Sequence, residues 1–415
     1  MKRDLTAGIV GCACGQDHAC PIRYIRIGAG ALQSVAEICK DFNRVLLVSD
    51  DNTDAVCGDK VRALLGEKLG VSLVLHADGV VVPDEACLAR IEAVLEDTTD
   101  LILGIGSGVI NDLCKDVSFR HDLPYGIIAT APSMDGYASV GAALILGGMK
   151  ITRNARPPMA IVADTAVLTT APLEMLQAGY GDIVGKYSCL NDWKLATAIY
   201  GEYFCQTVYD LTMDTVHEVE PLAERIIARD EEAVGTLMQA LVTVGIAMSY
   251  VGNSRPASGS EHHLSHFFEI TGILNDEPYF AHGIDVLYSA VVTARLREEL
   301  VTKTPCRQAF DRAVWENEIR RIYLTSADGV IALQEKLGWY ERDDEAQVVP
   351  QWQALCDILR EAPDEQAMLK LVERIGLNYQ EFESLYGEEK LADAVRFAKD
   401  LKDRYTVLWL YGQYA

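Results

Sequence analysis

The chain has 415 residues, of which 49% are hydrophobic, and its 61 acidic and 37 basic side chains give a formal net charge of −24. At about 100–200 residues per domain, this length predicts two or three domains with sizeable cores. The acidic excess argues against a nucleic-acid or anionic-membrane surface, since either partner would require a basic face.

The first 21 residues form a predicted N-terminal arm that contains Cys12, Cys14, His18 and Cys20. Because Cys-x-Cys-x5-Cys is not a usual spacing for structural zinc, we expect ordinary thiols in a mobile arm. The apolar run at residues 5–10 is too short for a signal sequence, so export is not expected. The eleven cysteines are odd in number and irregularly spaced, which favours a reducing cytoplasmic location over a disulfide framework.

Short β-rich runs alternate with helical patterns between residues 22 and 168, which predicts a parallel α/β dinucleotide-binding domain. The predicted strands lie at residues 44–50, 72–77, 100–108, 125–133, 142–148 and 157–164. From residue 169 to 415, helical periodicity prevails and predicts an all-helical domain for metal and substrate. The uncharged stretch 233–253 is long enough to span a bilayer, but its glycines and polar side chains favour a buried core helix.

The stretch "GIGSGVIND" at residues 104–112 follows a predicted strand and precedes a helical pattern. Glycines allow the backbone to approach a phosphate, and a helix N-terminus offers unpaired N–H donors. The spacing matches neither G-x-G-x-x-G nor a P-loop, so an ordinary turn is an equal alternative for this stretch alone. Asp50 and Asp51 end an earlier strand, where an acid can hold a ribose and repel a 2′-phosphate. Together the two features favour a dinucleotide, with NAD preferred over NADP.

Four of the eight histidines lie in "SGSEHHLSHFFEITGILNDEPYFAHG". His262 and His266 share one helical face, whereas His263 is rotated away by about 100°. His282 follows a loop, and Asp182 in "AGYGDIVGKYS" is the best acidic partner. One aspartate and two histidines would make a three-ligand site with an open position, as in catalytic metal centres. The alternative, preferred for His263, is that these histidines only cap or satisfy helix ends.

Five motifs together carry a family resemblance: "GIGSGVIND", "TAPSMDGYAS", "ADTAVLTTAPLEMLQAGYGDIVGKYSCLNDWK", "GNSRPASGSEHHLSH" and "HGIDV". From about residue 22 to its end, the chain resembles the sn-glycerol-1-phosphate dehydrogenase family, and its bacterial branch in particular. That family is part of a larger group with iron-containing alcohol dehydrogenases, glycerol dehydrogenases and dehydroquinate synthases. The resemblance implies a dehydroquinate synthase-like fold, with a Rossmann-like α/β domain followed by helices.

The resemblance also implies residue roles. One divalent ion, zinc or nickel, would be held by Asp182, His262 and His282, while His266, Asp135 and Asp182 would contact the substrate. NAD(H) or NADP(H) would be bound by residues of the first domain, namely Asp50, Gly106, Ser107, Gly108, Val109, Ile110, Thr130, Ser133 and Ser139.

Cations near these motifs are candidates for catalysis or for binding a phosphate. Lys186 occupies the place of a fourth metal ligand in iron-containing alcohol dehydrogenases, and it suits a phosphate or a polarised oxygen unless it lies at the surface. Arg255 in "NSRPASG" is the second candidate for the substrate. Lys150, Arg153 and Arg156 form another basic island, which we expect to be a solvated hairpin.

The implied reaction interconverts dihydroxyacetone phosphate, a small phosphorylated triose, and sn-glycerol 1-phosphate by hydride transfer at C2, a step in phospholipid metabolism. His266 and Asp135, with Lys186, are the implied catalytic residues, and a homodimer is the implied assembly. Three alternatives remain open: a glycerol or polyol dehydrogenase acting on an unphosphorylated substrate, a dehydroquinate-synthase-like lyase, and a silent metal- or nucleotide-binding protein.

Overall fold

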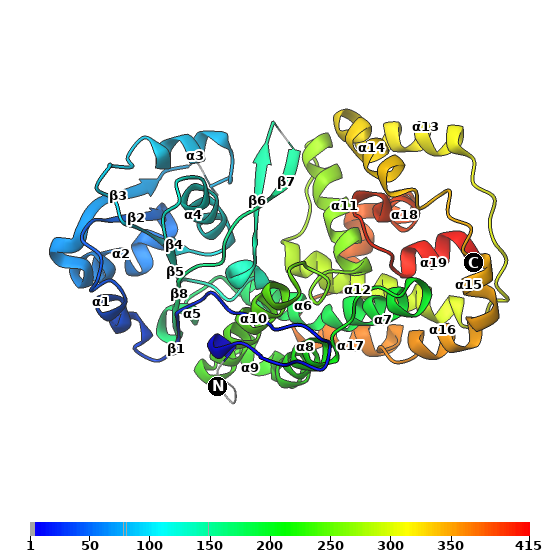
Figure 1. Cartoon of the computed structure of the whole chain (residues 1–415), viewed down its shortest axis with the longest axis horizontal. Helices are drawn as coiled ribbons and strands as arrows, with labels where there is room; N and C mark the ends of the chain where they lie inside the picture. The colour runs from blue at the N-terminus through cyan, green and yellow to red at the C-terminus, as the bar shows by residue number, and fades with distance from the viewer. Residues whose placement is uncertain (1–4, 78, 80, 148) are drawn as a thin grey trace. The chain divides into compact units, whose positions relative to one another are not determined.

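A computed structural model of the chain describes residues 5–77, 79, 81–147 and 149–415. Residues 1–4 of the expected arm and Gly148 of the expected strand 142–148 lie outside the described residues. The chain divides into two compact units, each formed by two segments of sequence. The first unit contains Met1–Tyr180 and His217–Ser254, and the second contains Gly181–Val216 and Arg255–Ala415 (Figure 1).

A parallel β-sheet forms the centre of the first unit. Within the described residues it has six strands in the order β1-β8-β5-β4-β2-β3. The strands are β1 (Tyr24–Gly28), β2 (Val45–Asp50), β3 (Leu69–Leu75), β4 (Leu101–Gly106), β5 (Tyr125–Ala129) and β8 (Ala160–Asp164). Strands β4, β5 and β8 are buried along their whole length. Their largely apolar sequences are typical of a parallel sheet that is covered on both faces. The predicted α/β class is therefore confirmed.

The chain changes direction across the sheet between β2 and β4. From β2 it runs outward to β3, whereas from β4 it runs the opposite way to β5. Right-handed crossovers then place α2 (Asp51–Leu65) and α4 (Gly108–Arg120) on opposite faces of the sheet. The carboxyl ends of β2 and β4 therefore flank a topological switch point, which is where open parallel sheets bind ligands.

Two strands were absent from the sequence prediction. The edge strand β1 is short, and β7 (Met149–Asn154) carries two basic residues, Lys150 and Arg153, so neither has the buried apolar run of the central strands. Strand β7 pairs in antiparallel register with β6 (Gly141–Leu146). The basic island 150–156 thus begins in a hairpin, as expected.

The helices of the first unit cover the sheet and contact its loops. They are α1 (Val35–Ile38), α2, α3 (Glu85–Glu92), α4, α5 (Thr165–Leu168), α9 (Ala223–Ile227), α10 (Glu231–Val251) and the first part of α6 (Leu173–Val184), whose last residues, from Gly181, belong to the second unit. By length and composition α10 could cross a bilayer, but it is mostly buried. It packs on the short helix η4 (Asp135–Ala138), where Ser249 Oγ donates to the carbonyl of Ala138 at 2.9 Å.

All the regular structure after β8 is helical within the described residues, as the sequence predicts. The second unit contains α7 (Lys186–Tyr200), α8 (Gln206–Val219), α11 (Ser260–Asn275), α12 (His282–Leu300), α13 (Arg312–Tyr323), α14 (Ala327–Leu337), α15 (Glu345–Val348), α16 (Trp352–Leu359), α17 (Glu365–Arg374), α18 (Tyr379–Phe397) and α19 (Val407–Tyr414). Its short 3-10 turns are η6 (Leu324–Ser326), η7 (Val349–Gln351) and η8 (Ala398–Leu401). Those of the first unit are η1 (Leu5–Ala7), η2 (Ala31–Ser34), η3 (Gly66–Lys68), η4 and η5 (Glu220–Leu222).

Candidate metal centre and cofactor edge

The second unit brings Asp182, His262 and His282 together. One potential ligand atom from each residue lies within 4.8 Å of the other two. His262 Nε2 is 3.5 Å from Asp182 Oδ1, and the rings of His262 and His282 are 5.1 Å apart between centroids. One carboxylate and two imidazoles form a donor set that suits zinc or nickel and leaves a position open for substrate.

Close packing of two helices positions the aspartate opposite the second histidine. Asp182 lies near the end of α6, and His282 is the first residue of α12. A Cβ atom at Gly181 would lie 2.2 Å from the carbonyl oxygen of Gly283. Glycine is therefore required at residue 181 for the α6 backbone to approach the start of α12.

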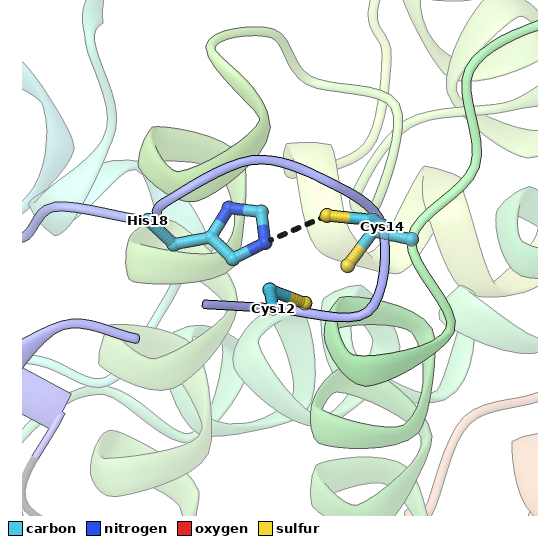
Figure 2. A group of neighbouring side chains, drawn as sticks. Cys12, Cys14 and His18 are labelled. Carbon is cyan, nitrogen blue, oxygen red and sulfur yellow. Dashed lines mark hydrogen bonds between the residues drawn. The ribbon is translucent and has the colours of Figure 1, made fainter. Parts of the chain in front are cut away.

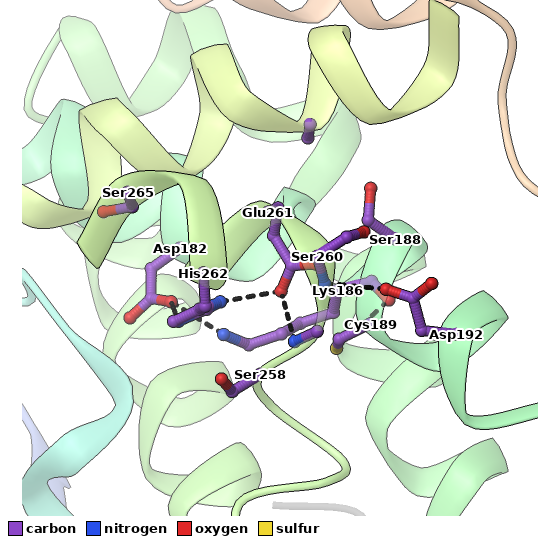
Figure 3. Close-up of polar contacts among 12 residues, drawn as sticks. Asp182, Lys186, Ser188, Cys189, Asp192, Ser258, Ser260, Glu261, His262 and Ser265 are labelled. Atoms are coloured by element: carbon purple, nitrogen blue, oxygen red, sulfur yellow. Dashed lines mark hydrogen bonds and ion pairs between the residues drawn. The ribbon is translucent and has the colours of Figure 1, made fainter. Parts of the chain in front are cut away.

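Two neighbouring side chains fix the orientation of the histidine rings. His262 Nδ1 is 2.7 Å from Glu261 Oε1 (Figure 3). His282 Nδ1 is 3.3 Å from Ser265 Oγ. Both contacts engage Nδ1, so Nε2 is the nitrogen of each ring that a metal ion would bind. A carboxylate or hydroxyl behind a ligating histidine is the usual support of a metal centre. Sequence reasoning missed Glu261 and Ser265, although both lie next to or one turn from a predicted ligand.

Lys186 is completely buried, so the interpretation as a surface lysine was wrong. Its Nζ donates to Asp182 Oδ1 at 2.7 Å. Burial alone would raise the pKa of Asp182, but the charge of Lys186 and the hydrogen bond with His262 hold that pKa far below its usual range. Asp182 is therefore an anion, and its two oxygens have enough lone pairs to accept from Lys186 and bind a metal.

The other two histidines of the cluster differ in environment. The ring of His266 lies 6.0 Å from His262 and 5.4 Å from His282, so it borders the three-ligand group. His263 is fully buried, and neither of its ring nitrogens has a hydrogen-bond partner among the described residues. Burial, with the nearby charge of Arg404, lowers the pKa of His263 well below its usual value, so this ring is neutral.

The helix that carries the histidines is held at its N-terminus by Asp192 of α7. Asp192 Oδ2 accepts from the backbone N–H of Ser260, and Oδ1 accepts from that of Val407, each at 2.7 Å. Burial and the nearby Glu261 carboxylate raise the pKa of Asp192 to about 6. Asp192 was not predicted from the sequence, because its partners lie about 70 and 215 residues away.

Arg255, which we predicted to bind substrate, is buried in an ion pair. It donates to both oxygens of Glu202, at 2.7 and 2.6 Å, and to the carbonyl of Tyr405 at 2.8 Å. A phosphate would have to displace this charge-assisted bidentate contact. The geometry therefore favours a structural role for Arg255 over phosphate binding.

Two arginines of the basic island in the first unit also form ion pairs with aspartates. Arg153 lies 3.4 Å from the carboxylate of Asp116, and Arg156 donates to Asp122 at 2.8 Å. These partly exposed pairs account for the two arginines as surface contacts of the hairpin region.

The predicted cofactor residues gather at the carboxyl edge of the sheet in the first unit. Asp50 ends β2, Gly106 ends β4, and Thr130 follows β5. Ser107 is the N-cap residue of α4 without a side-chain cap, so the first-turn N–H groups of that helix remain available to an anion. The strand, glycine turn and helix expected around residues 104–112 are therefore present and lie beside the switch point.

Asp50 and Ser139 also have structural contacts. The carboxylate of Asp50 accepts from the backbone N–H of Thr53 at 2.8 Å, and Thr53 Oγ1 accepts from the backbone N–H of Asp50 at 3.0 Å. This capping box fixes the carboxylate at the sheet edge. Ser139 Oγ accepts from the buried Lys115 at 3.1 Å. Asp135 begins η4 and is half-buried, and Ser133 lies in the loop just before it.

Comparison with known proteins shows the family and the fold of the chain. Residues 26–172 match the family described as iron-containing alcohol dehydrogenase. The chain is 29% identical over 412 residues to glycerol-1-phosphate dehydrogenase [NAD(P)+] of Bacillus licheniformis, covering 97% of this chain and 92% of that protein. It is 35% identical over 292 residues to the protein of the same name from Halalkalibacterium halodurans. That match covers 69% of this chain and 73% of that protein. A probable glycerol dehydrogenase from Sinorhizobium meliloti 1021 has a similar structure, with a TM-score of 0.60, 17% identity and 91% and 89% of the two chains covered.

The α/β unit and the helical unit together define the iron-containing alcohol dehydrogenase and dehydroquinate synthase-like fold. Within this class, the family is shown by the 35% identity to the Halalkalibacterium halodurans protein, of which 73% is covered. The chain belongs to the glycerol-1-phosphate dehydrogenase family.

Proposed function

We propose that the protein is an NAD(P)-dependent sn-glycerol-1-phosphate dehydrogenase that reduces dihydroxyacetone phosphate and catalyses the reverse reaction. The observation that carries this proposal is the group of Asp182, His262 and His282, with its supporting residues, in a chain of this family. The relatives' names include both the phosphorylated substrate and NAD(P)+.

The residues of the second unit fit one divalent ion, zinc or nickel, held by Asp182, His262 and His282. When bound, the ion would act as a Lewis acid toward the carbonyl group of the substrate. Glu261 and Ser265 would keep the two imidazole rings in the tautomer that ligation requires. Lys186 would keep Asp182 ionised and oriented, because it is the buried counter-charge of that carboxylate.

Proton transfer is assigned to His266. Reduction adds a hydride to C2 and a proton to its oxygen, and the cofactor supplies the hydride. His266 borders the ligand group but is not part of it, so its ring can donate the proton in reduction and accept it in oxidation. Asp135 of the first unit is proposed to bind the substrate hydroxyl.

The cofactor is proposed to bind at the switch point of the first unit. Its pyrophosphate would be held by the turn from Gly106 to Ile110, at the N-terminus of α4. Asp50 would accept from the adenosine ribose, which favours NAD because a 2′-phosphate would be repelled. Thr130, Ser133 and Ser139 would complete this site.

Two properties of the protein in the cell follow from the same proposal. A cytoplasmic location is proposed from the odd number and irregular spacing of the eleven cysteines. A homodimer is proposed from the family resemblance, and size-exclusion chromatography with light scattering would test it. The product would serve phospholipid metabolism.

The experiment is NADH oxidation by metal-loaded protein with dihydroxyacetone phosphate, compared with dihydroxyacetone. We expect rapid oxidation with the phosphorylated ketone, poor oxidation with the other, and sn-glycerol 1-phosphate as the product. Good turnover of dihydroxyacetone would identify a polyol dehydrogenase instead. If neither ketone were reduced by protein that binds metal and NAD, but a heptulosonate phosphate were consumed without net NADH change, the activity would be that of a lyase.

A further inference from the structure

The N-terminal segment is folded rather than a mobile arm. Ile9 and His18 form an antiparallel bridge, in which each backbone N–H donates to the carbonyl of the other at 2.8 Å. Inside the loop that this bridge closes, the N–H of Gly15 donates to the carbonyl of Cys12 at 2.9 Å. Gly8 has a φ of +69°, and a Cβ atom there would lie 2.5 Å from the carbonyl oxygen of His18. A glycine is therefore required for the two ends of the loop to meet.

The loop brings two thiols and one imidazole together. Cys14 Sγ lies 3.4 Å from His18 Nε2, and the Sγ atom of Cys12 lies within 4.8 Å of both groups (Figure 2). Cys20 is not part of this group. The Cys-x-Cys-x5-Cys spacing, which is unusual for zinc, therefore included a cysteine that does not lie with the other two. The spatial set is Cys-x-Cys-x3-His. Two sulfur donors and one nitrogen donor favour zinc over magnesium, calcium or manganese.

His18 is held in the orientation of a ligand. Its Nδ1 lies 2.9 Å from the carbonyl oxygen of Tyr250. Because a carbonyl can only accept, Nδ1 carries a proton, so in the neutral ring the lone pair of Nε2 faces the thiols. A ligating histidine normally donates its other ring nitrogen to a carbonyl or carboxylate in this way.

The same residue of α10 anchors the segment at a second point. The hydroxyl of Tyr250 donates to the carbonyl of Leu5 at 2.7 Å, and its ring lies 5.5 Å from that of His18. His18 is only 1% exposed, so its ring is held among packed side chains. A ligand at this loop would therefore tie the start of the chain to a core helix.

We propose that Cys12, Cys14 and His18 bind a zinc ion, separate from the metal centre of the second unit. Binding would release the two thiol protons and leave the thiolates and the neutral imidazole as ligands. The ion would stabilise the first unit by holding residues 12–18 in one conformation. This proposal does not depend on the proposed function, because it concerns different residues and is measured without substrate.

The test is zinc content per chain in the full-length protein, grown with zinc and dialysed without chelator. The wild type should hold about two ions per chain, and a Cys12→Ser/Cys14→Ser double variant about one. The matched control is Cys20→Ser, which removes a thiol of the same segment from outside the group and should keep the wild-type count. Equal zinc content in the wild type and the double variant would overturn the proposal.

Cobalt substitution provides a measurement that does not require a folded variant. Wild-type protein loaded with Co²⁺ should show sulfur-to-cobalt charge-transfer absorption in the near ultraviolet, since the centre of the second unit has no sulfur ligand. This absorption should persist in His262→Ala. Its absence from the wild type would show that Cys14 and His18 share only a thiol hydrogen bond.

Discussion

Glu261 Oε1 lies 2.7 Å from Nδ1 of His262, whose Nε2 faces Asp182 at 3.5 Å. A carboxylate, an imidazole and a second carboxylate thus form a continuous buried chain. Glu261 Oε1 also accepts from the backbone N–H of Gly259 at 3.0 Å, which fixes the glutamate itself. The metal centre is therefore shaped by a residue that is not a ligand.

Glu261→Gln should weaken metal binding by about 10–100-fold, because a neutral amide makes the His262 ring a less basic ligand. The measurement is the concentration of free zinc that gives half-maximal activity of the apo protein. Activity at saturating metal should recover to near the wild-type value. Glu269→Gln, on the same helix, is the control and should leave the zinc requirement unchanged. An unchanged requirement in Glu261→Gln would show that the glutamate only packs.

Lys186→Met should destabilise the metal-free protein by about 3–5 kcal/mol, because it leaves Asp182 buried without its counter-charge. The loss should be clearly smaller in the metal-loaded protein, since a divalent ion supplies positive charge to the same carboxylate. Urea unfolding of both forms measures the difference. Lys194→Met is the matched control on α7, where a partly exposed pair with Glu361 should be worth about 1 kcal/mol or less. An equal loss with and without metal would contradict the shared role of Asp182.

Asp192 should make stability fall as pH rises. Its pKa is about 6 in the folded protein against 3.8 ordinarily, so the folded state binds more protons between these two values. The contribution lost across this window is up to about 3 kcal/mol. Asp192→Asn should be less stable than wild type, because an amide cannot accept from both Ser260 and Val407, but the gap should narrow from pH 4 to pH 6. Denaturant unfolding of the two metal-free proteins from pH 4 to pH 6 measures this difference in the free energy of unfolding. A difference that stays constant with pH would contradict the prediction.

Asp50→Asn should shift the cofactor preference toward NADP. Asparagine is also a good N-cap residue, so α2 should keep its start while the charge opposite the ribose is lost. We expect the ratio of kcat/KM for NADPH to that for NADH to rise about 10-fold or more, as about 1.4 kcal/mol of removed repulsion would give. Asp51→Asn is the matched control. Asp51 is the first residue of α2 and pairs with His76, so its substitution should leave this ratio unchanged. If the two variants behaved alike, Asp50 would not be the ribose contact.

The sequence predicted those parts of the molecule that have local signals. Buried apolar runs identified the central strands, and the glycine turn at residues 104–112 identified the junction of β4 and α4. The i, i+4 spacing of His262 and His266 placed both rings on one side of α11. Each of these features depends on residues that are close in sequence.

Features that depend on distant partners could not be predicted in this way. The pairing of Arg255 with Glu202 joins residues 53 positions apart, and no local pattern distinguishes it from a phosphate ligand. His18 is fixed by a carbonyl 232 residues away, and the N-terminal spacing carries no signal of that contact. The assignment of α10 to the first unit likewise follows from its packing on η4, and its composition carries no such signal.

The most direct test of the central claim is metal titration of chelator-treated protein with dihydroxyacetone phosphate and NADH present. For the wild type, we predict no NADH oxidation before metal is added and recovery with zinc or nickel, whereas Asp182→Asn and His262→Ala should recover little activity at any metal concentration. Full activity in the chelator-treated wild type, or wild-type recovery in both variants, would contradict a metal centre formed by Asp182, His262 and His282.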